Sequence, residues 1–389
     1  MRILTLALLA MAAPLAGQEA LVDRGYEHFY NLEYEEAIAD FQSAIHLYPN
    51  VPDLHNHMAE ALVFREMFRN GALESELVSG TNSFLRRPKL NPSPETEKRF
   101  LDEIGTSMSL CQARLKTDPK NTAAMYALGI AYGLRANYYW LVKKSWQNSL
   151  RDATAARRLH NRVSQLEPGN VDARLVQGLH DYVVGSLPLM YRMLGFLVGI
   201  RGDKQKGIQT VQYVAAHGKQ NNVEAEIFLG TLYRRENQPR KAIAIVEDLI
   251  RRFPRNYLLR LELSQMYSMA GDKGHALTAL DELISLKSRR SPGYERVPWE
   301  KIWFQQGTIQ FWYNDFDLAL ENMRKVTAAE NEVDLNTGVY AWLRMGQIYD
   351  MTHRREQALH SYRKAIAYAP EAEAAQESRK YLSAPYRRM

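Results

Sequence analysis

Apolar and small residues recur along this chain at the spacing of α-helices. In AEIFLGTLYRRENQPRKAIAIVEDLIRRFP they are Leu229, Gly230, Tyr233, Ala242, Val246, Leu249 and Pro254. In VYAWLRMGQIYDMTHRREQALHSYRKAIAYAP the corresponding residues are Trp342, Gly346, Tyr349, Ala358, Tyr362, Ala365 and Pro370. Residues three and four positions apart share one face of a helix, and a proline ends a helix. Each segment therefore predicts two amphipathic helices joined by a short turn.

The sizes of these residues predict how the helices pack. Gly346 and Ala358 are small, which lets the two helices of one pair cross closely, whereas Tyr349 and Tyr362 are expected to fill the gap between neighbouring hairpins. This pattern resembles the tetratricopeptide repeat superfamily, and fainter copies run from end to end of the chain. The resemblance implies an all-α, right-handed solenoid of about eight helical hairpins, with a polar helix from Pro370 to Leu382 as its C-terminal cap.

The repeats divide the chain into regions of different regularity. We expect N-terminal hairpins over residues 18–121, irregular hairpins over 122–222, regular hairpins over 223–372, and a capping helix and tail over 373–389. A polar, proline-punctuated loop is predicted at 70–98. Two further insertions, at 138–151 and 186–206, are expected between the two helices of the third and fourth hairpins.

The insertion in the fourth hairpin contains an apolar run of 14 residues, Leu187 to Ile200, which includes Arg192. A membrane span needs about 20 apolar residues, so this run is too short and too charged to cross a bilayer. We expect an inserted helix that covers the core, plugs the groove or touches a membrane surface; the residues that would make this contact are Met190, Arg192, Leu194 and Leu197. The tripeptide Arg201-Gly202-Asp203 is expected to be the turn before the next helix, with Asp203 as its cap.

The middle of the chain, residues 122–233, is similar to a narrower group. Gly178, the Ser186-Leu187-Pro188 stretch, GIRGD and AEIFLGTLY occur in the order typical of the tetratricopeptide repeat protein 39 family, whose fungal members are inclusion body clearance proteins. The resemblance implies a binding rather than a catalytic role. Those relatives are intracellular, whereas this chain begins with a leader-like segment.

The first residues, MRILTLALLAMAAPLAGQEA, have the layout of a secretory signal peptide: a basic start, an apolar run and small residues at Ala16 and Gly17. We expect residues 1–17 to be a signal peptide cleaved near Ala16-Gly17, and the mature protein to be periplasmic or secreted in a bacterium. Gln18 stands where a lipoprotein would need cysteine, so lipid attachment at that site is excluded.

Composition and motifs favour binding over chemistry. The chain has 50 basic and 44 acidic residues and a net charge of +6, but the charges are interspersed, so no nucleic-acid partner is expected. Metal, nucleotide and nucleophile motifs are missing from the sequence. His55 and His57 point to different faces of a helix and are expected to face solvent or cap it, and Cys111 is expected in the core. No catalytic residue, cofactor or metal is predicted.

In a solenoid of this class the first helix of each hairpin lines a concave groove. Aromatic and arginine side chains supply most interface energy, so the residues at groove-facing offsets are candidates for contact with a partner. They are Tyr26, Phe29, Tyr30, Tyr126, Arg234, Arg235, Gln265, Phe304, Phe311, Trp312, Tyr340, Gln347 and Asp350.

Two functions remain open from the sequence. The first is an exported, non-enzymatic scaffold that binds a protein or peptide along its concave groove. The alternative is a peripheral, membrane-associated assembly factor that uses the inserted apolar helix 187–200 and nearby basic residues. The partner and the oligomeric state are open in both.

Overall fold

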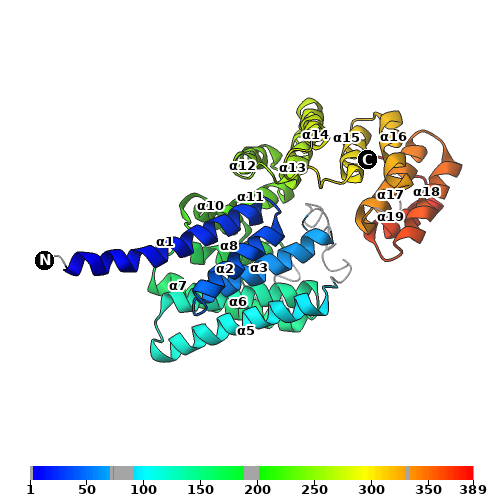
Figure 1. The fold of residues 1–389 in the computed structure, drawn as a ribbon. Coiled ribbons are helices and arrows are strands. Elements are labelled where there is room, and N and C mark those ends of the chain that lie inside the picture. Colours follow the sequence, from blue (N-terminus) through cyan, green and yellow to red (C-terminus); the bar gives the residue numbers. More distant parts are fainter. Residues whose placement is uncertain (1–2, 71–72, 74–90, 188–200, 330–332, 389) are drawn as a thin grey trace. The chain divides into compact units, whose positions relative to one another are not determined.

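The computed structural model describes residues 3–70, 73, 91–187, 201–329 and 333–388, and this part of the chain contains seventeen α-helices and no strand. The all-α prediction is therefore confirmed. The first compact unit comprises Met1–Arg69 and Lys89–Leu232. Its helices are α1 (Ile3–Tyr30), α2 (Tyr34–Leu47), α3 (Pro52–Arg69), α5 (Pro94–Thr117), α6 (Thr122–Leu141), α7 (Trp146–Leu166), α8 (Leu175–Gly185) and α10 (Lys204–His217), with a short 3-10 helix at Asp172–Arg174. Figure 1 shows these helices stacked as antiparallel pairs.

The second compact unit includes Tyr233–Met389, and α11 (Asn222–Arg235) crosses the boundary between the units. Its helices are α12 (Pro239–Arg252), α13 (Tyr257–Met269), α14 (Lys273–Ser288), α15 (Trp299–Trp312), α16 (Phe316–Ala328), α17 (Leu335–Met351), α18 (Arg355–Tyr368) and α19 (Glu373–Ser383). Helix α19 packs against α18, in the place predicted for the capping helix.

Consecutive helices pack as hairpins in both units: α1 with α2, α3 with α5, α6 with α7, α8 with α10, α13 with α14, α15 with α16, and α17 with α18. A tight turn, in which the Gln238 amide donates to the Tyr233 carbonyl at 2.7 Å, joins α11 to α12. In the described part of the chain, the seven packed pairs and the α11–α12 turn agree with the prediction of about eight hairpins.

The close helix crossing predicted from residue size is confirmed in the last hairpin. A β-carbon on Gly346 would lie 2.4 Å from a ring carbon of Tyr362, and Ala358 and Tyr362 are both fully buried. A similar crossing joins α8 to α10, where a β-carbon on Gly207 would lie 2.4 Å from the Tyr182 amide nitrogen. No larger residue fits either position without moving the helices apart.

The third hairpin differs from the prediction. Residues 138–141 continue α6 and Trp146 begins α7, so the extra residues lengthen the two helices and not their connection. The Lys144 backbone in that connection has a φ of 51°, which makes the sharp turn between them. Apolar residues such as Tyr138 and Leu141 are buried, and burial of this additional surface favours continued helix over loop.

The fourth hairpin is only partly described. Residues 188–200, with Met190, Arg192, Leu194 and Leu197, lie outside the described residues, so the inserted apolar helix stays a prediction. The turn after it is described: the Asp203 side chain accepts a hydrogen bond from the Lys206 amide at 3.0 Å and caps α10, as predicted.

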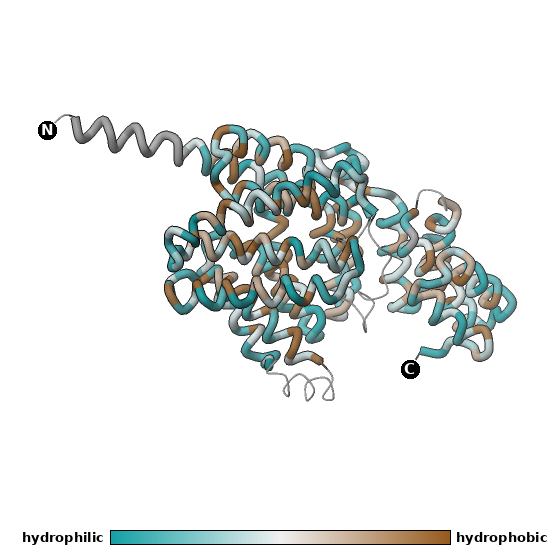
Figure 2. Tube along the Cα trace, turned by 90° about the horizontal axis from the view of Figure 1, so that it is seen from below, coloured by the Kyte–Doolittle hydropathy of each residue, from teal (hydrophilic) through white to brown (hydrophobic). Residues whose placement is uncertain are grey.

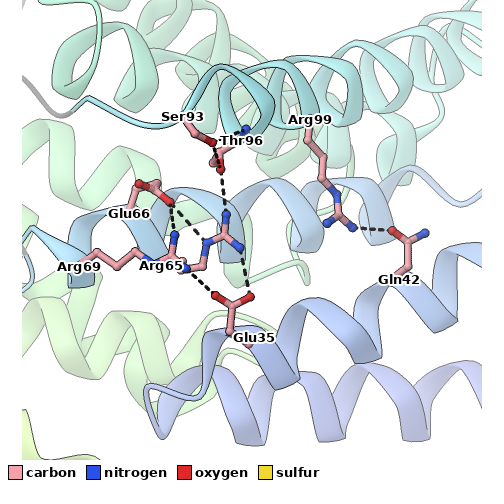
Figure 3. A network of polar contacts seen from close by, with 8 residues as sticks. All are labelled: Glu35, Gln42, Arg65, Glu66, Arg69, Ser93, Thr96 and Arg99. Atoms are coloured by element: carbon pink, nitrogen blue, oxygen red, sulfur yellow. Dashed lines mark hydrogen bonds and ion pairs between the residues drawn. The ribbon is translucent and has the colours of Figure 1, made fainter. Parts of the chain in front are cut away.

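Polar contacts tie the beginning of the first unit together across three helices (Figure 3). Glu35 on α2 accepts from Arg65 at 3.2 Å and from Arg69 at 2.8 Å, both on α3. Arg65 also donates to Thr96 on α5 at 3.1 Å, and Ser93 caps that helix by accepting from the Thr96 amide. This network orders α2, α3 and α5 on the solvent side while the apolar faces form the core.

Polar and apolar residues alternate within the described helices, as Figure 2 shows. Among the described residues, none of the helices combines the length and the apolar character that crossing a membrane requires. Cys111 is fully buried on α5, as predicted, and burial raises the pKa of its thiol to about 11.

Candidate partner-binding surfaces

Six polar and aromatic side chains meet inside the first unit, on the first helices of its hairpins. They come from α1, α3, α6 and α11, and we call them the inner cluster: Tyr26, Tyr30, His57, Glu60, Tyr126 and Glu224. Tyr30 and Glu224 are 194 positions apart in sequence yet hydrogen bonded. The stacking of successive hairpins thus brings α1 into contact with α11.

The two tyrosines of α1 form the aromatic side of the inner cluster. Their rings stack with centroids 5.6 Å apart and planes 23° apart. The Tyr26 hydroxyl lies 2.6 Å from Nδ1 of His57 and donates to Oε2 of Glu60 at 3.2 Å. The Tyr30 hydroxyl donates to Oε1 of Glu224. Each hydroxyl therefore positions one carboxyl group.

The position of Glu224 depends on how α11 begins. The Asp172 carboxylate accepts hydrogen bonds from the backbone amides of Lys219, Gln220 and Asn221 at 2.9 to 3.1 Å. The Asn221 side chain donates to the Tyr126 hydroxyl at 2.7 Å. These contacts hold the chain before α11 against α6, and they place Glu224 in the first turn of α11.

The electrostatics of the inner cluster are unusual in a chain of net charge +6. Burial and the neighbouring Glu224 raise the pKa of Glu60 to about 8, against an opposing hydrogen bond from Tyr26. Burial also raises the pKa of Glu224, and it lowers the pKa of His57 to about 4. His57 is therefore neutral at pH 7, and within the described residues no lysine or arginine forms an ion pair with either glutamate.

One carboxylate oxygen of the cluster has no partner. Oε2 of Glu224 is buried and accepts no hydrogen bond from the described part of the chain. A buried, unpaired carboxylate oxygen is costly because it has lost its water without gaining a donor. Within the described residues, Oε2 of Glu224 is thus an acceptor without a donor.

The inner cluster does not form a metal centre within the described residues, where no group of three histidine, cysteine, aspartate or glutamate side chains is arranged around a common point. His55, expected at the surface, is instead buried: its Nδ1 lies 2.6 Å from Glu103 and its Nε2 lies 2.9 Å from the Pro49 carbonyl. The expectation of exposure was wrong because the neighbouring α5 covers this part of α3.

The predicted contact residues of the first unit divide into two kinds. Tyr26, Tyr30 and Tyr126 meet in the inner cluster. Phe29 lies behind them in the core, with its ring centroid 5.1 Å from that of Phe64. Phe29 therefore supports the cluster and exposes almost no surface of its own.

The predicted residues at the start of the second unit are more scattered. Arg234 is buried and pairs with Glu262 on α13 at 3.3 Å, whereas Arg235 is exposed. Gln265 is half-buried on α13, and Phe304 is buried in the hydrophobic core. These four residues do not form a common site.

The remaining predicted residues lie on α15 and α17. Phe311 is fully buried, Trp312 is 50% exposed, and Tyr340 is half-buried against the hydrophobic core. Gln347 donates to Glu377 on α19 at 3.1 Å. Asp350 accepts from Arg355 at 2.9 Å and from the Tyr362 hydroxyl at 2.8 Å, so it is held by the protein's own residues.

Several residues of these surfaces were not predicted from the sequence. His57 and Glu60 lie in the second hairpin, whose degenerate pattern gives no offsets from which groove-facing residues could be identified. Glu224 stands at the start of α11, outside the offsets used. The tail residues Tyr386 and Arg388 follow the last repeat and belong to no periodic pattern.

Comparison with known protein families identifies repeats in two segments of the chain. Tetratricopeptide repeat profiles match residues 229–295 and 339–371. These two segments of the chain are tetratricopeptide repeats. The profile matches fall on the hairpins that the sequence pattern marks most clearly, and the narrower resemblance to the tetratricopeptide repeat protein 39 family stays a prediction.

A relative of this repeat protein is the BBSome complex member BBS4 homolog of Drosophila melanogaster, which is 27% identical over 148 residues. The match covers 38% of this chain and 28% of that relative, so the two share only a segment. The structure is also similar to that of yeast Tom70, with 12% sequence identity and a TM-score of 0.39 over 94% of this chain and 95% of Tom70. For the human IFIT1 dimer with m7Gppp-AAAA, the identity is 15% and the TM-score 0.45 over 92% of this chain and 78% of the IFIT1 chain. At these TM-scores neither structure indicates a ligand for this chain.

Proposed function

We propose that the repeat protein is an exported, non-enzymatic scaffold that binds a protein or peptide partner along the first helices of its first unit. A lysine or arginine side chain of the partner would enter the inner cluster between Glu60 and Glu224. The observation that carries this proposal is that the half-buried Glu60 and Glu224 have no cationic partner among the described residues, while Oε2 of Glu224 is buried without a hydrogen-bond donor.

The chemistry of the inner cluster suits a cationic side chain. A cation between the two glutamates would favour their ionised forms and donate to the unpaired Oε2 of Glu224. The stacked rings of Tyr26 and Tyr30 add aromatic faces, which attract ammonium and guanidinium groups and bury the aliphatic part of their side chains. Charge-assisted hydrogen bonds in a partly buried site are stronger than those at an exposed surface.

A general-base role is less well supported. His57 is the nearest histidine, but its Nδ1 is engaged by the Tyr26 hydroxyl and burial keeps its ring neutral. Catalysis by Glu60 would need a reacting group in reach, and the nearest polar groups are tyrosine hydroxyls. Tetratricopeptide repeats are protein-interaction modules, and this favours the scaffold further.

Affinity selection with peptide libraries tests the proposal. The full mature chain is incubated with three libraries of twelve-residue peptides with randomised flanks, whose fixed central residue is lysine, arginine or norleucine. Bound peptides are identified by mass spectrometry. We expect enrichment from the lysine or arginine library at least tenfold above the norleucine library, because norleucine has a similar aliphatic chain without the charge.

Two variants serve as matched controls. Glu60→Gln combined with Glu224→Gln keeps the size of both side chains and should abolish the enrichment. Glu36→Gln changes an exposed glutamate on α2 and should leave it unchanged. Equal binding from the norleucine library, or enrichment that survives the double substitution, would refute the role of the inner cluster.

Export is tested separately. If residues 1–17 are a signal peptide, as proposed, the protein isolated from its native host lacks about the first 17 residues and is found outside the cytoplasm. Intact mass measurement of the native protein decides this. A full-length mass in the cytoplasmic fraction contradicts export and leaves the binding proposal untouched.

A further inference from the structure

The last residues of the chain lie across the second unit. After α19 ends at Ser383, residues 384–388 have no helical structure and run back over the C-terminal end of α15 and over α17. We call these residues the C-terminal tail. They reach the residues on α15 and α17 that the repeat pattern predicts to face a partner.

Tyr386 anchors the middle of the C-terminal tail. Its backbone amide donates to Oδ2 of Asp350 at 2.7 Å. Its ring centroid lies 6.3 Å from that of Phe311 and 5.2 Å from that of Tyr381. The tail thus uses a backbone hydrogen bond and an aromatic contact, the combination by which an extended peptide binds a protein surface.

Arg388 anchors the end of the C-terminal tail. Its guanidinium group donates to the carbonyls of Phe311 at 2.6 Å and Trp312 at 3.1 Å, and to the side chain of Asn314 at 2.7 Å. These carbonyls belong to the last turn of α15, where the helix dipole favours a cation. The guanidinium carbon also lies 4.5 Å and 5.1 Å from the ring centroids of Phe311 and Trp312.

The fit of the tail is incomplete in two respects. Nε of Arg388 is buried without a hydrogen-bond partner among the described residues. The guanidinium of Arg344 lies over the same two rings, 4.2 Å and 5.2 Å from their centroids, so two like charges share one aromatic pair. The pKa of Arg344 is lowered to about 10, mainly by burial and partly by Arg388. Both features weaken the tail's hold on this surface.

We propose that the C-terminal tail is an internal ligand of the second unit and that a partner segment with tyrosine followed two residues later by arginine displaces it. The surface that this segment would bind consists of Phe311, Trp312, Asn314, Arg344 and Asp350. This proposal concerns a different unit from the inner cluster and does not depend on it.

Binding of a labelled tail peptide tests the proposal. The probe is the fluorescein-labelled peptide Ser-Ala-Pro-Tyr-Arg-Arg-Met, which has the sequence of residues 383–389. A tethered segment competes at an effective concentration of about 1 mM or higher, so the wild-type full chain should bind the probe weakly. The full-chain variant Arg388→Ala weakens the competitor and should bind the probe at least tenfold more tightly in fluorescence anisotropy.

The neighbouring arginine offers a matched control. Arg387 is exposed, so Arg387→Ala should leave binding of the probe unchanged. A probe in which the second arginine is replaced by alanine should not bind to any variant. If Arg388→Ala gains no affinity for the probe while its thermal unfolding matches that of the wild type, the tail is a fixed part of the fold and the proposal is wrong.

A second readout covers the case in which Arg388→Ala unfolds. Excess unlabelled probe is added to the wild-type chain, and hydrogen exchange is followed at the Tyr386 amide, which is protected by Asp350. Displacement predicts at least tenfold faster exchange at Tyr386, with no change in amides of α13. Unchanged protection at a saturating concentration of probe would overturn the proposal.

Discussion

The two units of this protein bury acidic side chains on the first helices of their hairpins, but they treat them differently. In the second unit Asp350 receives two hydrogen bonds from Arg355, one from Tyr362 and one from the tail. In the first unit Glu60 and Glu224 receive tyrosine hydroxyls and no cation among the described residues. A buried carboxylate is thus structural where the chain supplies its donors, and available for binding where it does not.

Removal of the Asp350 carboxylate should have the largest effect on stability. Asp350→Ala leaves Arg355, Tyr362 and the Tyr386 amide without their common acceptor. Loss of one partner of a fully buried ion pair costs about 3–5 kcal/mol, and because Arg355 is 31% exposed we expect the lower end, about 3 kcal/mol. We expect the free energy of unfolding of the second unit to fall by that amount in urea denaturation at pH 7.

Tryptophan fluorescence reports on this unit, because Trp299, Trp303, Trp312 and Trp342 are four of the six tryptophans of the chain. Asp317 on α16 is exposed, and Asp317→Ala should change the unfolding free energy by less than about 0.5 kcal/mol. A loss below about 1 kcal/mol for Asp350→Ala would mean that its hydrogen bonds are not structural.

Removal of the Glu60 charge should instead raise the free energy of unfolding. Because the pKa of Glu60 is raised to about 8 in the folded protein from an ordinary 4.5, the folded state binds the proton more tightly than the unfolded state. The stabilisation is complete below pH 4.5 and is lost as the pH rises through 8. Glutamine does not ionise, so Glu60→Gln avoids the loss of stability that ionisation of Glu60 causes. The variant should therefore be more stable than the wild type at pH 8 by about 1–3 kcal/mol.

The measurement is the unfolding free energy of the first unit between pH 5 and 9, followed by hydrogen exchange in α3 and α6. The wild-type profile should fall over this range, and the Glu60→Gln profile should be flatter. Glu36→Gln should follow the wild type. A Glu60→Gln variant that is less stable than the wild type at pH 8 would show that the charge is already satisfied.

The smallest effect on stability is expected for substitution of Tyr26, whose hydroxyl donates to Glu60. Tyr26→Phe removes the hydrogen bond that lowers the pKa of Glu60, so the pH at which stability is lost should move above 8. The lost hydrogen bond costs about 1 kcal/mol at most. Tyr132→Phe, on α6 and outside the inner cluster, is the control and should leave the pH profile unchanged. A shift of equal size in this control would mean that the effect is not specific to the inner cluster.

The helices and their pairing could be predicted from the sequence because they depend on residues close in the chain. Gly346 and Tyr362 lie on the two helices of one hairpin, and the small residue permits the close contact that the structure shows. The lengthened third hairpin was mispredicted because residues 138–151 carry no proline to end α6, and tertiary burial of Tyr138 decides the helix boundary.

The binding surfaces were predicted only in part. Tyr26, Tyr30 and Tyr126 follow from repeat offsets, but their meeting with Glu60 and Glu224 depends on how five hairpins stack, which no local pattern states. Phe311 and Asp350 have the right offsets, yet the tail covers them. A segment beyond the last repeat has no periodicity, so its path could not be derived from the sequence.

The most direct test of the inner cluster is the number of protons released when a cationic peptide binds. Isothermal titration calorimetry at pH 7, in two buffers of different ionisation enthalpy, measures this number for the best peptide from the lysine or arginine library. We predict release of close to one proton from the wild-type protein, because the cation ionises a carboxyl group whose pKa is about 8. Tight binding without proton release would contradict the account.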